Sequence, residues 1–149
     1  MLEFLRNLFV YDKWAMSRSL ATLETPENSR AQSMLSHVLL AEKIWLTRLQ
    51  GQDSSSIRVF DELTLPECMR LSDELNNAYL QYIDSLTEAD LDRLIKYQNT
   101  KGDDFETSIK DILTHVGLHS VYHRGQIALL VRDGGGEAVG TDYILFTRL

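Results

Sequence analysis

Helix-breaking residues are scarce in this chain. Its 149 residues include only two prolines and eight glycines, and three of the glycines stand together at 134–136. So few breakers favour long helices over a β-sandwich, which needs many turns. The length is sufficient for one domain with a well-formed core, and a hydrophobic content of 44% supplies enough apolar material for that core. We therefore expect a single domain spanning residues 1–149.

Apolar residues recur at helical spacing in four segments. They predict helices over 2–23, 30–49, roughly 65–86, and from a cap at Thr107 or Ser108 to about Arg132. The run TPENS at 25–29 reads as one helix end and the next start, Gly51 follows the second helix, and TLPE at 64–67 resembles a capping box. The predicted fold is an all-α four-helix bundle. The loop before the third helix is longer than a tight antiparallel turn needs, so an up-down-up-down order is not required.

Two shorter elements are predicted between the third and fourth helices. Residues 87–90 suggest a short helical turn, and residues 93–106 suggest a short hairpin around a Gly-containing turn. Residues 140–149 are expected to form a short, irregular tail.

The charge balance constrains the partners of the chain. A net charge of −7 disfavours binding to phosphate backbones, so we expect no nucleic-acid partner. No apolar run approaches the ~20 residues of a membrane span, so we expect no membrane partner either. The start of the chain lacks signal-peptide features, and one cysteine, Cys68, cannot form an internal disulfide. These features predict a cytoplasmic protein.

Histidines form the most informative motif. His115, His119 and His123 follow one stripe of the predicted fourth helix at a spacing of four residues. His37 lies near the inward face of the second helix and is a natural third ligand beside two of them. Three imidazoles and an open position are typical of a catalytic zinc-type site. Ser120 occupies the glutamate position of an H-E-x-x-H motif, which disfavours metalloprotease chemistry.

The spacing alone leaves a second interpretation open. Histidines on an apolar face are often hydrogen-bonded core residues, and a helical scaffold with buried, metal-free histidines would share this pattern. His115, one turn before His119, is an alternative ligand or a residue that orients the ligands or lines a pocket.

Four motifs together resemble the DinB superfamily, which includes YfiT-like proteins. They read HVGLHSVYHRGQI at 115–127, YDKWA at 11–15, HVLLAEKIWLTRLQG at 37–51 and GTDYILF at 140–146. The resemblance implies a four-helix bundle that binds a divalent metal through His37, His119 and His123. Asp12 and Met16 stand where relatives often have Asn, and we expect these departures to affect only local packing.

The resemblance implies one set of metal ligands but several possible reactions. Some relatives use low-molecular-weight thiols in metal-dependent transfer, isomerisation or hydrolysis. The leading hypothesis is therefore an enzyme in which a divalent metal, Zn or Ni, activates a thiol or water against a small-molecule substrate. The alternative is a non-catalytic metal-binding stress-response protein. A homodimer is the expected assembly.

Other polar or reactive residues have structural interpretations. Arg124 is expected to form a structural ion pair or to cap a neighbouring loop. Gln126 is expected to be a buried hydrogen-bonding residue, and Gly125 to allow close approach of another helix. Glu42 is expected to be a salt-bridge partner rather than a general base, and Cys68 an unreactive, half-buried thiol.

Overall fold

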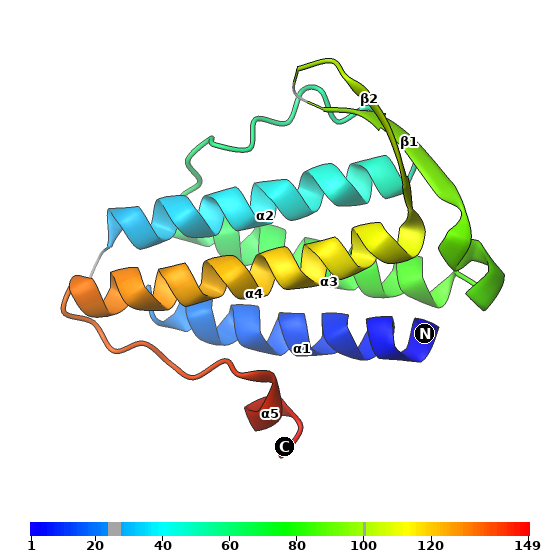
Figure 1. The fold of residues 1–149 in the computed structure, drawn as a ribbon. Helices are drawn as coiled ribbons and strands as arrows, with labels where there is room; N and C mark the ends of the chain where they lie inside the picture. Colours follow the sequence, from blue (N-terminus) through cyan, green and yellow to red (C-terminus); the bar gives the residue numbers. More distant parts are fainter. Residues whose placement is uncertain (24–27, 100) are drawn as a thin grey trace.

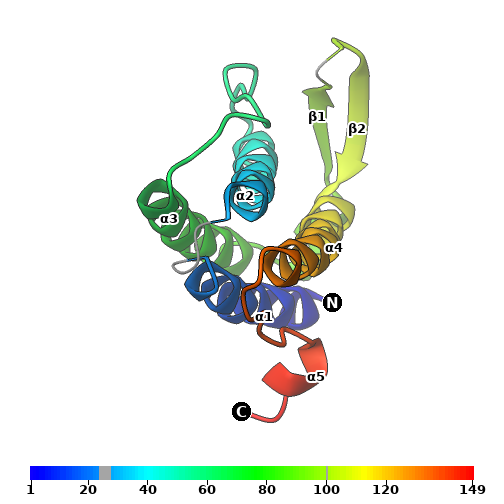
Figure 2. The same cartoon turned by 90° about the vertical axis from the view of Figure 1, so that its left-hand side faces the viewer.

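Four long helices dominate the computed structural model, which describes residues 1–23, 28–99 and 101–149. They are α1 (Leu2–Ala21), α2 (Ser29–Leu49), α3 (Leu65–Asp84) and α4 (Ile109–Asp133). Seen along their length, α1 and α2 lie on opposite sides of the bundle, and each packs against both α3 and α4 (Figure 2). The predicted all-α four-helix bundle is confirmed.

Polar side chains begin three of these helices. Thr64 and Glu67 form the predicted capping box at α3, and the Ser108 side chain accepts a hydrogen bond from the Asp111 amide at α4. The Asn28 side chain accepts a hydrogen bond from the Ala31 amide at α2, so the predicted start near residue 29 is confirmed. The helix-end signal at 25–27 lies outside the described residues.

The bundle does not follow an up-down-up-down order. Helices α2 and α3 run in the same direction, while α1 and α4 both run the opposite way (Figure 1). The chain from 50 to 64 therefore returns along the length of α2 before α3 begins. This long return segment places residues 57–61 beside α2, where they contribute to the candidate site.

The segment between α3 and α4 contains both predicted elements. A 3₁₀ helix, Glu88–Asp92, precedes strands β1 (Leu94–Gln98) and β2 (Asp104–Ser108). The strands pair antiparallel, with Leu94 opposite Ser108 and Gln98 opposite Asp104. This hairpin leads into the first turn of α4 and stands beside the return segment (Figure 2).

The C-terminal segment is more ordered than predicted. It contains a short helix, α5 (Tyr143–Phe146), which packs on α1. The rings of Tyr143 and Phe146 contact Tyr11 edge-on at centroid distances of 5.1 and 5.8 Å, and the Tyr11 hydroxyl donates to the Thr141 carbonyl at 2.7 Å. Aromatic packing against α1 thus orders a segment that has too few residues to show a helical period.

The core lies between the four helices. Fully buried residues come from every long helix and include Leu5, Leu35, Leu39, Ile83, Ile112 and Ile127. Among the described residues, no helix combines the length and apolar character needed to cross a membrane.

Candidate metal centre

His37 of α2 and His119 and His123 of α4 converge on one point between two adjacent helices. One ring nitrogen from each residue can be chosen so that all three lie within 4.8 Å of one another. The ring of His37 lies 4.9 Å from that of His123 and 5.6 Å from that of His119, measured between centroids. The spacing along α4 brings His119 and His123 together, with centroids 4.4 Å apart.

Carbonyl oxygens orient two of these rings. Nδ1 of His123 lies 2.7 Å from Oε1 of Gln126, and Nδ1 of His37 lies 3.3 Å from the Val59 carbonyl oxygen. A carbonyl oxygen can only accept, so each Nδ1 carries the proton and each Nε2 presents its lone pair. Nε2 of His123 faces Nε2 of His119 at 3.1 Å. Metal-binding histidines commonly have this second hydrogen bond to a carbonyl or carboxylate.

Partial burial favours the neutral form of two of the three histidines. Burial lowers the pKa of His37 from its ordinary value, and it lowers the pKa of His119 to about 4, assisted by repulsion from protonated His123, His115 and His37. A histidine must be neutral to bind a metal, so these environments favour the binding form. The three converging nitrogens fit a divalent cation that accepts imidazole ligands.

His115 does not join this group. Its ring lies 5.5 Å from the ring of His119 and 5.3 Å from that of Trp45, between the histidine group and the end of α2. Among the described residues, the group of possible ligands consists of His37, His119 and His123 alone. His115 therefore lies next to the ligand group rather than within it. This position fits a residue that orients the ligands, not an alternative ligand.

A buried ion pair supports the turn of α4 that carries the two histidines. Arg124 pairs with Asp12 of α1, and its Nη1 also donates to Oγ of Ser120 at 2.5 Å. The predicted structural ion pair of Arg124 is confirmed. The expectation that Asp12 affects only local packing is wrong, because its carboxylate joins α1 to α4. Met16 is fully buried in the core.

Glu42 and Cys68 have environments that differ in part from the predictions. Glu42 is buried but forms no salt bridge within the described residues, and its Oε1 has no hydrogen-bond partner there. Burial, followed by repulsion from Asp12, raises the pKa of Glu42 well above its ordinary value. Cys68 is fully rather than half buried, and burial raises the pKa of its thiol, as expected for an unreactive cysteine.

The predicted close approach of another helix at Gly125 is wrong, and such an approach occurs at Gly117 instead. A Cβ added at Gly125 would meet nothing within 4 Å, so no helix approaches there. At Gly117 a Cβ would lie 2.6 Å from Cδ2 of Leu8, so this glycine is where α1 approaches α4 closely. The spacing of glycines along α4 cannot distinguish these two faces.

Comparison with known proteins agrees with this architecture. The family model described as "DinB family" matches residues 17–149. The chain belongs to the DinB family. It is 26% identical over 163 aligned positions to Protein DinB of Bacillus subtilis (strain 168), covering 98% of this chain and 95% of that protein.

Solved structures support the DinB fold. A DinB-like protein from Bacillus cereus ATCC 10987 matches with a TM-score of 0.71 at 16% identity, covering 93% of this chain and 95% of that one. A DinB-like protein from Bacillus subtilis matches with a TM-score of 0.67 at 17% identity, covering 91% and 95%. The resemblance stated from the four motifs is therefore confirmed at the level of family and fold.

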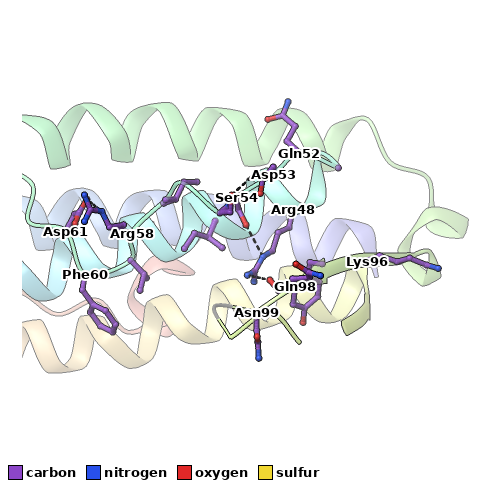
Figure 3. Close-up of a pocket in the computed structure, with 17 residues that line it drawn as sticks. Arg48, Gln52, Asp53, Ser54, Arg58, Phe60, Asp61, Lys96, Gln98 and Asn99 are labelled. Atoms are coloured by element: carbon purple, nitrogen blue, oxygen red, sulfur yellow. Dashed lines mark hydrogen bonds and ion pairs between the residues drawn. The ribbon is translucent and has the colours of Figure 1, made fainter. Parts of the chain in front are cut away.

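A pocket of about 930 Å³ adjoins the histidine group in this DinB-family chain (Figure 3). Its walls come from the end of α2, the return segment and the hairpin. Phe60 lines the pocket and stacks on His37 with ring centroids 5.0 Å apart, and the neighbouring Val59 supplies the carbonyl that orients His37. Sequence reasoning missed both residues because they lie in a loop without periodicity. The role of Gln126 was detectable from its position three residues after His123.

Proposed function

We propose that this DinB-family protein is a metal-dependent enzyme whose divalent metal is bound by His37, His119 and His123. The observation that carries the proposal is the convergence of three imidazoles from two helices, two of them with Nδ1 fixed by a carbonyl oxygen. That arrangement presents lone pairs to a common point. Buried histidines that served only packing would instead be expected to turn their nitrogens toward separate partners.

Neighbouring residues of the chain hold the three histidines in position. Gln126 and Val59 hold the His123 and His37 rings in one tautomer, and the Asp12–Arg124 pair fixes the turn of α4 that carries His119 and His123. A bound divalent cation would supply Lewis acidity that lowers the pKa of a thiol or water near neutral pH. Zn or Ni is the proposed metal, because both accept imidazole nitrogen readily.

A small molecule is the proposed substrate. The adjoining pocket falls within the range of roughly 300–1,000 Å³ typical of small-molecule sites. We propose reaction of a low-molecular-weight thiol, or of water, with an electrophilic substrate, giving thiol transfer, isomerisation or hydrolysis. Glu42 is buried and does not line this pocket, so it is poorly placed to act as a general base. Activation of the nucleophile would therefore fall to the bound metal.

The test combines metal content with turnover. Untagged protein is purified, its metal is quantified, and thiol consumption with a generic electrophile is compared between the wild type and His119→Ala, with His115→Ala as the matched control. The proposal predicts stoichiometric metal and turnover in the wild type and in His115→Ala, and loss of both in His119→Ala. Stoichiometric metal without turnover of thiols or hydrolysable esters would instead identify a non-catalytic metal-binding protein.

We also propose that the protein is cytoplasmic and assembles as a homodimer through α4. Its outer face carries four exposed apolar residues and no exposed charged residue between Asp111 and Arg132. Those apolar residues are Leu118, Val121, Tyr122 and Leu129. A two-fold axis would pair this face with itself, which keeps the charges of two acidic copies away from the contact. Sedimentation should give a dimer for the wild type and for Leu94→Glu in the hairpin, but a monomer for Leu118→Glu. A monomeric wild type would contradict this assembly.

A further inference from the structure

The pocket beside the histidine group contains one cation that lacks an acidic partner. Two other cations of its lining are neutralised, since Arg58 lies 3.7 Å from an Asp61 carboxylate and Lys96 lies 3.1 Å from Glu106. Among the described residues, no carboxylate lies within ion-pair distance of the Arg48 guanidinium. Its Nε donates to Oγ of Ser54 at 3.3 Å and its Nη2 donates to the Gln98 carbonyl at 2.9 Å, both neutral oxygens (Figure 3).

Aromatic rings hold this guanidinium in place. Its central carbon lies 4.7 Å from the centre of the Trp45 ring and 4.5 Å from that of Tyr97. Partial burial lowers the pKa of Arg48, which shows that the charge is incompletely compensated by its surroundings. The cation is thus both fixed and partly desolvated, a combination that strengthens its attraction for an anion.

The free hydrogen-bonding capacity of Arg48 specifies the shape of its partner. A guanidinium has five N–H donors, and the described residues accept from two of them, on Nε and Nη2. The two rings contact the guanidinium, so an anion reaches it best along the edge formed by Nη1 and Nη2. A planar carboxylate matches that edge with two parallel hydrogen bonds.

The pocket connects this cation to the histidine group. Phe60 and Arg48 both line it, and Phe60 stacks directly on His37. His37 and Arg48 are eleven residues apart on α2, which corresponds to about 16 Å along the helix axis. A ligand that contacts both ends must therefore be elongated, and the exposed ring of Phe60 offers it an apolar surface between them.

We propose that the pocket binds an elongated, carboxylate-bearing small molecule, with the carboxylate on Arg48 and the reactive end at His37, His119 and His123. The placement of the reactive end rests on the proposed function, whereas the carboxylate site does not. A single negative charge suits the site better than a phosphate dianion, because Arg48 is the one cation of the described lining without an acidic partner. Asp53 and Asp61 lie in the same lining, and the whole chain carries a charge of −7.

The carboxylate site is tested on metal-free protein with a matched pair of probes. Phenylhexanoate and the uncharged phenylhexanamide are titrated calorimetrically into the wild type, Arg48→Gln and Arg58→Gln. Arg58→Gln is the control, because it removes a cation of the same pocket that is already paired with Asp61. The wild type should bind the acid at least about tenfold more tightly than the amide, and Arg48→Gln should lose that preference. Arg58→Gln should retain it.

Several results would overturn the carboxylate site. The carboxylate site would be contradicted if the wild type bound the acid and the amide equally, or if it bound neither probe. An unchanged preference in folded Arg48→Gln, or inorganic phosphate displacing the acid at lower concentration than acetate does, would also contradict it. Because no metal is present, failure of the metal-site proposal leaves this outcome unaffected.

The second arm tests the span of the pocket on metal-loaded protein. Mercaptooctanoate, which carries a thiol at its far end, should bind at least about tenfold more tightly to metal-loaded than to metal-free wild type, and phenylhexanoate should not. An equal affinity of mercaptooctanoate for both forms, when metal is demonstrably bound, would contradict the placement of the reactive end.

Discussion

Asp12 of α1 and Arg124 of α4 form an ion pair inside the bundle, and Arg124 directly follows His123 in the chain. The same guanidinium donates to Ser120, which directly follows His119. One buried cation therefore ties the turn of α4 that carries two candidate ligands to the neighbouring helix α1. Buried pairs of this kind are costly to break, because removing one partner leaves the other charged in the core.

Replacing Asp12 with Ala should destabilise the protein by about 3–5 kcal/mol, because Arg124 would remain buried without its counter-ion. Arg6→Ala is the matched control in the same helix, since Arg6 forms an exposed pair with Asp84. It should change the free energy of unfolding little. Denaturant titration measures both. Equal effects of the two variants would show that the buried pair contributes no more than an exposed one.

Replacing Gln126 with Leu should weaken metal binding by about 10- to 100-fold, because His123 would lose the acceptor that fixes its Nδ1 proton. Gln81→Leu, at an exposed position of α3, is the control and should leave the affinity unchanged. Competition with a chelator of known affinity measures the effect. Unaltered affinity in Gln126→Leu would mean that the hydrogen bond does not orient the ligand.

Metal-free protein should lose stability as the pH falls from about 6.5 toward 4. The pKa of His119 is lowered from 6.5 to about 4 in the folded state, so the unfolded chain binds more protons throughout this range. Protonation therefore favours unfolding as the pH falls. Urea titrations between these pH values should give a smaller loss in His119→Gln than in the wild type. Parallel curves for the two proteins would contradict the assignment.

Glu42 should show the opposite pH dependence. Its pKa is raised in the folded state, so the folded chain binds more protons than the unfolded one and stability falls as the pH rises above about 4.5. Glu42→Gln removes this loss, and its melting temperature should exceed that of the wild type by an amount that grows as the pH rises above about 4.5. Glu74→Gln, at an exposed pair with Arg70, should show no such growth. A constant difference for Glu42→Gln would refute this interpretation.

Much of the site could be predicted because it lies on helices. The period of the α-helix places His119 beside His123 wherever the helix packs, and the apolar neighbours of His37 place it on the inward side of α2. Motif resemblance supplied the choice of His37, His119 and His123 over sets that include His115, since spacing alone treats His115 and His119 alike.

The rest depends on tertiary packing that no local pattern encodes. Phe60 and Val59 reach His37 only because the return segment runs back along α2, and a loop sequence carries no period that predicts such a path. Likewise, Gly117 rather than Gly125 faces α1 because of how the helices are rotated about their axes. The partnership of Asp12 with Arg124 joins residues 112 positions apart, beyond the reach of any spacing argument.

Metal content of four single variants tests whether His37, His119 and His123 bind one divalent metal. His37→Ala, His119→Ala, His123→Ala and His115→Ala are purified without tags, loaded with Zn and dialysed, and the bound metal and melting temperature are measured together. The wild type and His115→Ala should retain one equivalent and melt higher with metal than without, because metal binds only the folded protein. The other three variants should lose both properties. Retention of a full equivalent by His119→Ala or His123→Ala, or loss of metal by His115→Ala alone, would contradict this ligand assignment.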